Sequence, residues 1–119
     1  MRILLVEDHF DSAQLFTAIL KKTGHEVRTV HSGRSGVLEA KSGNPEVIIS
    51  DIGLPDLNGY ELAKQIRAQK QFKDTLMIAI TGYGQPEDVD QALAAGFNHH
   101  MLKPVDWNKL NGLLETHAV

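Results

Sequence analysis

The sequence predicts an α/β protein in which five parallel strands alternate with five helices. Short apolar runs rich in strand-forming residues occupy residues 3–6, 47–50 and 76–80, as expected for strands that are covered on both faces. Runs of similar length but more polar composition occupy residues 27–30 and 98–102, and these suit the edges of a sheet. Each interval between consecutive runs has room for one helix and two loops, so the pattern is (βα)5.

Length and composition fit one domain of ordinary globular type. The chain has 119 residues, of which 42% are hydrophobic and 23% are charged, so we expect residues 1–119 to form a single domain. The absence of cysteine excludes disulfides and zinc–thiolate sites. A net charge of −3 disfavours nucleic acid and anionic membranes as partners. No apolar run approaches the roughly 20 residues of a membrane span, and we expect a cytoplasmic protein.

Signals for helix ends fill the intervals between the strands. Asp11 and Asn58 are each followed three residues later by Gln or Glu, which predicts N-caps of the capping-box type. A second helix is expected over about residues 34–41, Pro86 suits the first turn of a fourth, and Asp106 is expected to cap a fifth. The positions expected to face the core are Leu15, Phe16, Ile19 and Leu20 in the first helix, Leu62 and Ile66 in the third, and Trp107, Leu110, Leu113 and Leu114 in the fifth.

The order of the strands follows from their composition and from the handedness of their connections. The three most apolar strands, at residues 3–6, 47–50 and 76–80, belong in the centre of the sheet. With right-handed crossovers this gives the strand order 2-1-3-4-5, which is the flavodoxin-like, doubly wound arrangement. Ligands bind where the winding of such a sheet reverses, at the carboxyl ends of the first and third strands.

Polar residues follow the strands at this edge of the predicted sheet. They are Glu7, Asp8, Asp51, Thr81 and Lys103. Any one of them is ordinary at a strand end, but three clustered carboxylates repel one another by about 1 kcal/mol per pair in water and about 4 kcal/mol at an effective dielectric constant of 20. A cation is therefore expected among them. Oxygen ligands without thiolate or positioned histidine favour Mg²⁺, and Mg²⁺ in such a site indicates phosphoryl chemistry.

With these residues the chain resembles response-regulator receiver domains over nearly its whole length. The family carries an acidic pair after the first strand, here Glu7 and Asp8. It also carries a D-x-x-[LM]-P-x-[LM]-[DN]-G run, and residues 51–59 read DIGLPDLNG. Thr81 matches the family's hydroxyl residue after the fourth strand, and Lys103 with the proline that follows it matches the Lys-Pro after the fifth. The presence of four motifs in this order argues against a chance match.

The resemblance implies a phosphoacceptor site that depends on Mg²⁺. Asp51 would be the nucleophile that accepts a phosphoryl group from a phosphohistidine of a histidine kinase or a histidine phosphotransfer domain. Asp8, Asp51 and the backbone carbonyl of Gly53 would coordinate Mg²⁺, and Glu7 would hold a water bound to the metal. Such a domain is a signalling module rather than an enzyme, because it catalyses only its own phosphorylation and dephosphorylation.

The resemblance also implies a switch that follows phosphorylation. Lys103 and Mg²⁺ would share the charge of the phosphoryl oxygens, and the Thr81 hydroxyl would bind one of them and draw its loop inward. A docking face near the fourth helix, the fifth strand and the fifth helix would then change for a downstream protein partner. His100 stands where the family usually has Tyr or Phe, so its part in the switch is open. Tyr83 and Gly53 are expected to modulate the lifetime of the acyl phosphate by controlling access of water.

Other functions remain as alternatives. A receiver-like docking module that acts without phosphorylation would keep the fold, but all five key positions are filled. A flavodoxin-like FMN carrier would have to bind a phosphate where Glu7 and Asp8 present carboxylates. A phosphatase with an aspartyl nucleophile would place a second acid two residues after Asp51, where Gly53 stands. The sequence also leaves open whether this is a stand-alone regulator or the receiver of a larger protein such as a hybrid histidine kinase.

Overall fold

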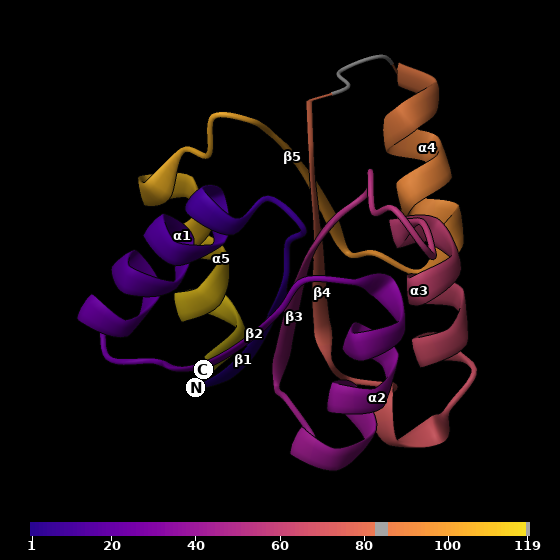
Figure 1. Cartoon of the computed structure of the whole chain (residues 1–119), viewed down its shortest axis with the longest axis horizontal. Helices are drawn as coiled ribbons and strands as arrows, with labels where there is room; N and C mark the ends of the chain where they lie inside the picture. Colours follow the sequence, from indigo (N-terminus) through magenta and orange to yellow (C-terminus); the bar gives the residue numbers. More distant parts are fainter. Residues whose placement is uncertain (83–85, 119) are drawn as a thin grey trace.

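A parallel sheet of five strands forms the centre of the computed structural model, which describes residues 1–82 and 86–118 (Figure 1). The strands are β1 (Arg2–Val6), β2 (Glu26–Val30), β3 (Val47–Asp51), β4 (Leu76–Thr81) and β5 (His99–Leu102). They lie in the order β2-β1-β3-β4-β5, and every neighbouring pair is parallel. The predicted fold class and strand order are therefore confirmed.

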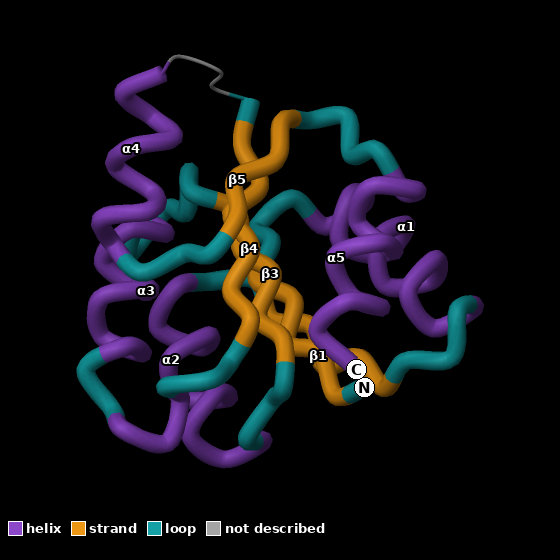
Figure 2. The backbone as a smooth tube through the Cα atoms, turned by 180° about the vertical axis from the view of Figure 1, so that it is seen from behind, coloured by secondary structure: helices purple, strands orange, loops and turns teal. Residues whose placement is uncertain are grey.

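Helices cover both faces of the sheet (Figure 2). One face carries α1 (Phe10–Lys22) and α5 (Trp107–Ala118). The other carries α2 (Gly33–Gly43), α3 (Gly59–Arg67) and α4 (Pro86–Ala95). A short 3-10 turn, Lys70–Phe72, follows α3. In the described part of the chain no helix is both long enough and apolar enough to cross a membrane.

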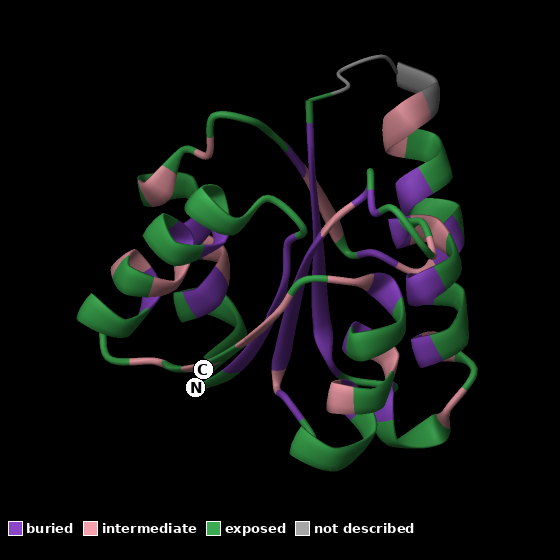
Figure 3. Ribbon diagram, in the orientation of Figure 1, coloured by how far each residue is buried: buried purple, intermediate pink, exposed green. Residues whose placement is uncertain are grey.

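Two apolar clusters, one on each face of the sheet, form the core. On the α2, α3 and α4 side, Leu4 and Ile48 pack with Ile66. On the α1 and α5 side, the alternate residues of the same strands pack with helix residues such as Leu110. Because β1, β3 and β4 are covered on both sides, their apolar residues are almost completely buried (Figure 3). This burial explains why the three strands are continuous apolar runs rather than alternating ones.

The helix caps agree with the sequence except at α1. Asn58 Oδ1 accepts a hydrogen bond from the Glu61 N–H at 3.0 Å, and Asp106 caps α5 through the N–H groups of its second and third residues. The prediction for Asp11 is wrong, because His9 is the N-cap of α1 and Asp11 lies in the first turn. A hydrogen bond from the His9 N–H to the Glu7 carboxylate, at 3.1 Å, turns the chain immediately after β1, so the helix begins earlier than the capping-box pattern predicts.

The buried side of α1 is also narrower than predicted. Phe16 and Leu20 are buried and Ile19 is partly buried, but Leu15 is 62% exposed. Ala13, together with Phe16 and Leu20, defines the face that contacts the sheet. Each residue of a helix is rotated by about 100° from the one before it, so Leu15 points away from this face.

A buried glycine explains how α2 packs against the sheet. The helix is longer than predicted, covering Gly33–Gly43, and Asn44 ends it in the left-handed conformation with φ of 45°. At Gly36 a Cβ atom would come within 2.9 Å of both Leu62 Cδ1 and Val6 Cγ2. The glycine therefore costs helix propensity but allows α2 to lie close to β1 and α3.

Candidate functional site

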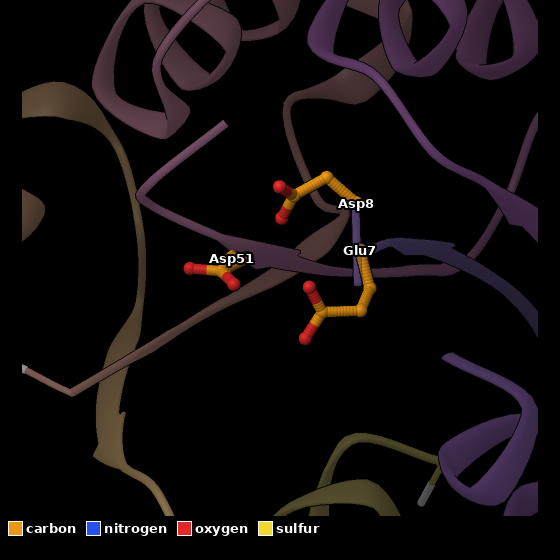
Figure 4. A group of neighbouring side chains, drawn as sticks. All are labelled: Glu7, Asp8 and Asp51. Carbon is orange, nitrogen blue, oxygen red and sulfur yellow. The ribbon is translucent and has the colours of Figure 1, made fainter. Parts of the chain in front are cut away.

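Three carboxylates meet at the carboxyl end of the sheet (Figure 4). One carboxylate oxygen from each of Glu7, Asp8 and Asp51 lies within 4.8 Å of the others. The strand register explains the meeting, because Val6 of β1 pairs with Ser50 of β3 and the next residues, Glu7 and Asp51, come side by side. Glu7 is buried, Asp51 is partly buried and Asp8 is exposed. The structure therefore brings the three predicted acidic residues together.

Lys103 joins two of these carboxylates. Its Nζ donates hydrogen bonds to Glu7 Oε1 at 3.0 Å and to Asp51 Oδ2 at 2.7 Å. The residue follows β5, and its backbone N–H donates to the Thr81 carbonyl at 2.9 Å. The pairing of Lys103 with Glu7 was not predicted, and no sequence motif indicates it.

Backbone N–H groups bind the second carboxylate oxygen of Asp51 and of Glu7. Asp51 Oδ1 accepts a hydrogen bond from the Gly53 N–H at 3.0 Å. Glu7 Oε2 accepts from the His9 N–H, so both oxygens of the Glu7 carboxylate have a partner. Asp8 lies at the open side of the group and is exposed.

Burial, hydrogen bonds and neighbouring charges shift the pKa values of Glu7 and Lys103. Burial raises the pKa of Glu7, while the hydrogen bonds from the His9 N–H and Lys103 lower it, and the nearby Asp51 charge raises it further. Burial lowers the pKa of Lys103, but its hydrogen bonds to Asp51 and Glu7 outweigh that effect and leave the pKa raised. Lys103 is therefore a stable cation, yet a single ammonium faces three carboxyl groups. This excess of negative charge favours a further cation.

The donor atoms fit a hard divalent cation such as Mg²⁺. The carboxylates of Asp8 and Asp51 lie at the exposed side of the group, and Gly53 adds an exposed backbone segment two residues after Asp51. Oxygen donors with room for water are what Mg²⁺ prefers. Glu7 is less suited to direct coordination, because Lys103 and a backbone N–H already occupy its oxygens.

An apolar cavity of about 450 Å³ opens beside the charged group. Its charged wall includes Asp51 and Lys103, and its apolar wall includes Phe16 of α1 and Trp107 of α5. The two aromatic rings pack edge to face with centroids 4.8 Å apart. The sequence does not indicate this cavity, because its lining comes from strands, two helices and the segment after β5, and these residues form no motif.

Thr81 lies close to the charged group, whereas Tyr83 falls outside the described residues. Thr81 is the last residue of β4 and is 1% exposed. Its carbonyl bonds the backbone of Lys103, which places it next to the residue that contacts Asp51. The expected effect of Tyr83 on phosphoryl lifetime stays a prediction.

His100 lies on β5, away from the carboxylates. It pairs with Ala79 of β4 and lines a second cavity, of about 400 Å³, with residues of α4, β5 and α5. Its Nε2 atom is buried and has no hydrogen-bond partner among the described residues. Burial lowers the pKa of His100, and the Asp88 carboxylate opposes this shift. The ring is therefore part of the α4 and β5 surface and not of the charged group.

Comparison with known proteins gives one consistent result. The family model described as "Response regulator receiver domain" matches residues 3–115. The chemotaxis protein CheY homolog of Campylobacter jejuni is 32% identical over 97% of this chain and 90% of its own length. Protein PilH of Pseudomonas aeruginosa is 32% identical over 88% of this chain and 87% of its own length.

Solved structures agree with these relatives. The chemotaxis response regulator CheY4 of Vibrio cholerae is 30% identical, with a TM-score of 0.90 over 98% of this chain and 97% of that one. The receiver domain of the sensor histidine kinase PA1611 from Pseudomonas aeruginosa was solved with a magnesium ion coordinated in its active-site cleft. It is 32% identical, with a TM-score of 0.88 over 97% of this chain and 94% of that one.

Proposed function

The chain belongs to the response-regulator receiver family, and on this premise we propose that Asp51 is the phosphoacceptor of a two-component or phosphorelay system. The proposal covers residues 1–119 as one receiver domain, working in the cytoplasm as a signalling module. The phosphoryl donor is a phosphohistidine of a histidine kinase or of a histidine phosphotransfer domain. The observation that carries the proposal is the contact of Asp51 with Lys103, 2.7 Å long, inside a group of three carboxylates.

In the transfer, phosphorus exchanges its bond to a histidine nitrogen for a bond to an Asp51 oxygen. An oxygen of the Asp51 carboxylate attacks the phosphorus in line with the phosphorus–nitrogen bond. That bond breaks, the imidazole leaves and takes up a proton, and Asp51 becomes an acyl phosphate. The Gly53 N–H, which donates to Asp51 Oδ1, orients the carboxylate for the attack.

Charge stabilisation is divided among the neighbouring residues. Asp8, Asp51 and the Gly53 carbonyl would hold Mg²⁺, which would supply positive charge for the phosphoryl oxygens. In support, the receiver domain of the sensor histidine kinase PA1611 was solved with a magnesium ion in its active-site cleft. Lys103 supplies the second positive charge, because its ammonium already lies against Asp51. Glu7 would hold a water bound to the cation, and its own hydrogen bond keeps Lys103 directed at the site.

The output follows from Thr81 and the surface beside it. The Thr81 hydroxyl binds a phosphoryl oxygen and draws the end of β4 inward. His100 lies on the next strand and lines the cavity between α4, β5 and α5, so we assign it to the moving surface. Two exposed leucines, Leu93 and Leu102, lie on α4 and β5, and they suit a downstream protein partner.

Phosphorylation by a small acyl phosphate tests the proposal directly. With Mg²⁺ present, intact mass should show the addition of one phosphoryl group to the wild type and none to Asp51→Asn. Circular dichroism of both proteins checks that the variant is folded, and a chelator should abolish the reaction. Equal modification of Asp51→Asn would contradict the nucleophile assignment. An unmodified wild type, with this donor and with a phosphorylated histidine kinase, would favour the docking module that acts without phosphorylation.

A further inference from the structure

We infer that Asp56 is a positioning residue of the acceptor site, because it ties the loop after β3 to the first residues of α2. The loop comprises residues 52–58 and carries Gly53. The inference rests on the proposed function, in which the Gly53 carbonyl is a ligand of the cation. Asp56 itself touches neither the phosphoryl group nor the cation, and it acts through the backbone that it holds.

The contact of Asp56 with α2 uses both oxygens of its carboxylate. Oδ1 accepts a hydrogen bond from the Gly33 N–H at 2.8 Å, and Oδ2 accepts from the Arg34 N–H at 3.1 Å. The first N–H groups of a helix have no partner within the helix, and the helix dipole favours an anion there. These backbone hydrogen bonds lower the pKa of Asp56, so the carboxylate is ionised when it binds α2.

Close packing reinforces this contact. Gly33 is buried, and a Cβ atom there would lie 2.7 Å from the Leu57 Cβ. The first turn of α2 therefore lies directly against the loop beside Asp56. At the base of the loop, the Gly59 N–H donates to the Ile52 carbonyl at 2.9 Å. The loop is fixed at its base by its own backbone and near its tip by α2.

Residues 30–34, which lead into α2 and include its first two residues, also contact the other acidic segment. The Glu7 N–H donates to the Val30 carbonyl at 3.0 Å, and His31 Nδ1 lies 3.0 Å from the Glu7 carbonyl. Residues 30–34 contain no acidic residue, yet they contact both segments that supply the carboxylates. Through Asp56 this stretch sets the distance between the Glu7 side of the site and the Gly53 side.

Two variants of Asp56 and one matched control test the inference. Asp56→Ala removes both hydrogen bonds to α2. Asp56→Asn retains one side-chain oxygen, which can accept only one of them. Ser32→Ala is the control, because the Ser32 side chain caps the same helix by accepting from the Ser35 N–H at 3.2 Å. The control weakens α2 without touching the loop. Urea unfolding of all three variants measures how much each change destabilises the fold.

The decisive measurements are backbone amide spectra without metal and Mg²⁺ titrations. Trp107, the only tryptophan of the chain, lines the same cavity as Asp51 and reports binding by fluorescence. Asp56→Ala should shift the Gly53 amide resonance and weaken Mg²⁺ binding about tenfold, the usual size of an effect transmitted through a supporting residue. Asp56→Asn should have a smaller effect, and Ser32→Ala should leave both readouts near those of the wild type.

Two results would overturn the assignment of Asp56. One is a Gly53 amide resonance that does not move in Asp56→Ala. The other is a loss of Mg²⁺ affinity in Ser32→Ala equal to that in Asp56→Ala, because the effect would then come from the helix alone. A wild type that fails to bind Mg²⁺ would instead contradict the proposed cation site, and the metal-free spectra would still decide the role of Asp56.

Discussion

Arg67 and Lys103 lie at opposite ends of the sheet, and they differ in the oxygens that they bind. At the amino ends of β4 and β5, Arg67 binds uncharged oxygens, whereas at the carboxyl ends Lys103 binds carboxylates. The shortest contacts of Arg67 are to the carbonyls of Gly96 and Phe72, at 2.9 and 2.7 Å, and to the side-chain oxygen of Asn98, at 2.8 Å. The contacts of Arg67 connect loops, whereas the contacts of Lys103 neutralise carboxylate charge.

This difference separates a structural end from a functional end. A guanidinium carries several donors in a fixed plane, so it can bind several oxygens at once. An ammonium between two carboxylates can be exchanged for another cation or can follow a new anion. Arg67 therefore provides rigid contacts at the amino ends of β4 and β5, and Lys103 provides exchangeable contacts at the carboxyl ends.

Arg67→Ala should have the largest effect on stability. Two carbonyls and one amide oxygen each lose a hydrogen bond, and we expect the free energy of unfolding to fall by about 3 kcal/mol. Mg²⁺ affinity should stay unchanged, because the residue lies at the opposite end of the sheet. Urea unfolding and Mg²⁺ titration check both statements, and a large loss of Mg²⁺ affinity would contradict the separation of the two ends.

Lys103→Ala should destabilise the metal-free protein less, by about 1 to 2 kcal/mol. The carboxylates of Glu7 and Asp51 lose their cation, with side chains 6% and 13% exposed, but the lysine itself is 38% exposed. Mg²⁺ should restore part of the loss, because it replaces the missing charge. Thermal melts with and without Mg²⁺ measure this, and a metal-independent loss would show that Lys103 is as structural as Arg67.

Asp8→Asn should stabilise the metal-free fold by about 1 kcal/mol, because it removes one of three mutually repelling carboxylates. The same change should weaken Mg²⁺ binding. A gain in metal-free stability together with a loss of Mg²⁺ affinity is what a site of mutually repelling carboxylates predicts. A lower melting temperature for the variant without metal would argue against repulsion within the group.

The smallest expected effect concerns His100 and pH. Burial lowers its pKa from the usual 6.5, so folding favours the neutral ring. The resulting stability is present above pH 6.5 and is lost as the pH falls through the pKa of the folded state. His100→Phe should therefore lose less stability than the wild type between pH 7.5 and pH 5.5 in urea unfolding. His25, whose pKa is also lowered by burial, is present in both proteins and cancels in the difference.

The sequence was sufficient for the fold because each strand and most helix ends have a local signal. Asn58 and Asp106 were predicted as caps and have that role. His9 was missed, because imidazole caps are uncommon and Asp11 offered a better pattern. The prediction that Leu15 faces the core is wrong, because the sequence does not show whether an apolar residue beside the buried face of a helix is itself buried.

The acidic group was also predictable, since parallel strands place all their carboxyl ends at one edge of the sheet. Asp8 and Asp51 therefore needed only a strand assignment to be brought together. The contacts of Arg67 and Asp56 could not be predicted, because most of their partners are backbone groups that every residue carries. Such contacts depend on the path of the chain and not on the identity of the partner.

The division of the core by the sheet has a consequence for how the protein tolerates substitution. Residues on the α3 side, such as Ile66, share no contact cluster with residues on the α5 side, such as Leu110. Sites without shared partners contribute to stability additively, whereas neighbours in one cluster couple. A double-mutant cycle between Ile66 and Leu110 should therefore close with almost no interaction energy. The two halves of the interior are thus free to drift apart in evolution, each repacking without compensation from the other.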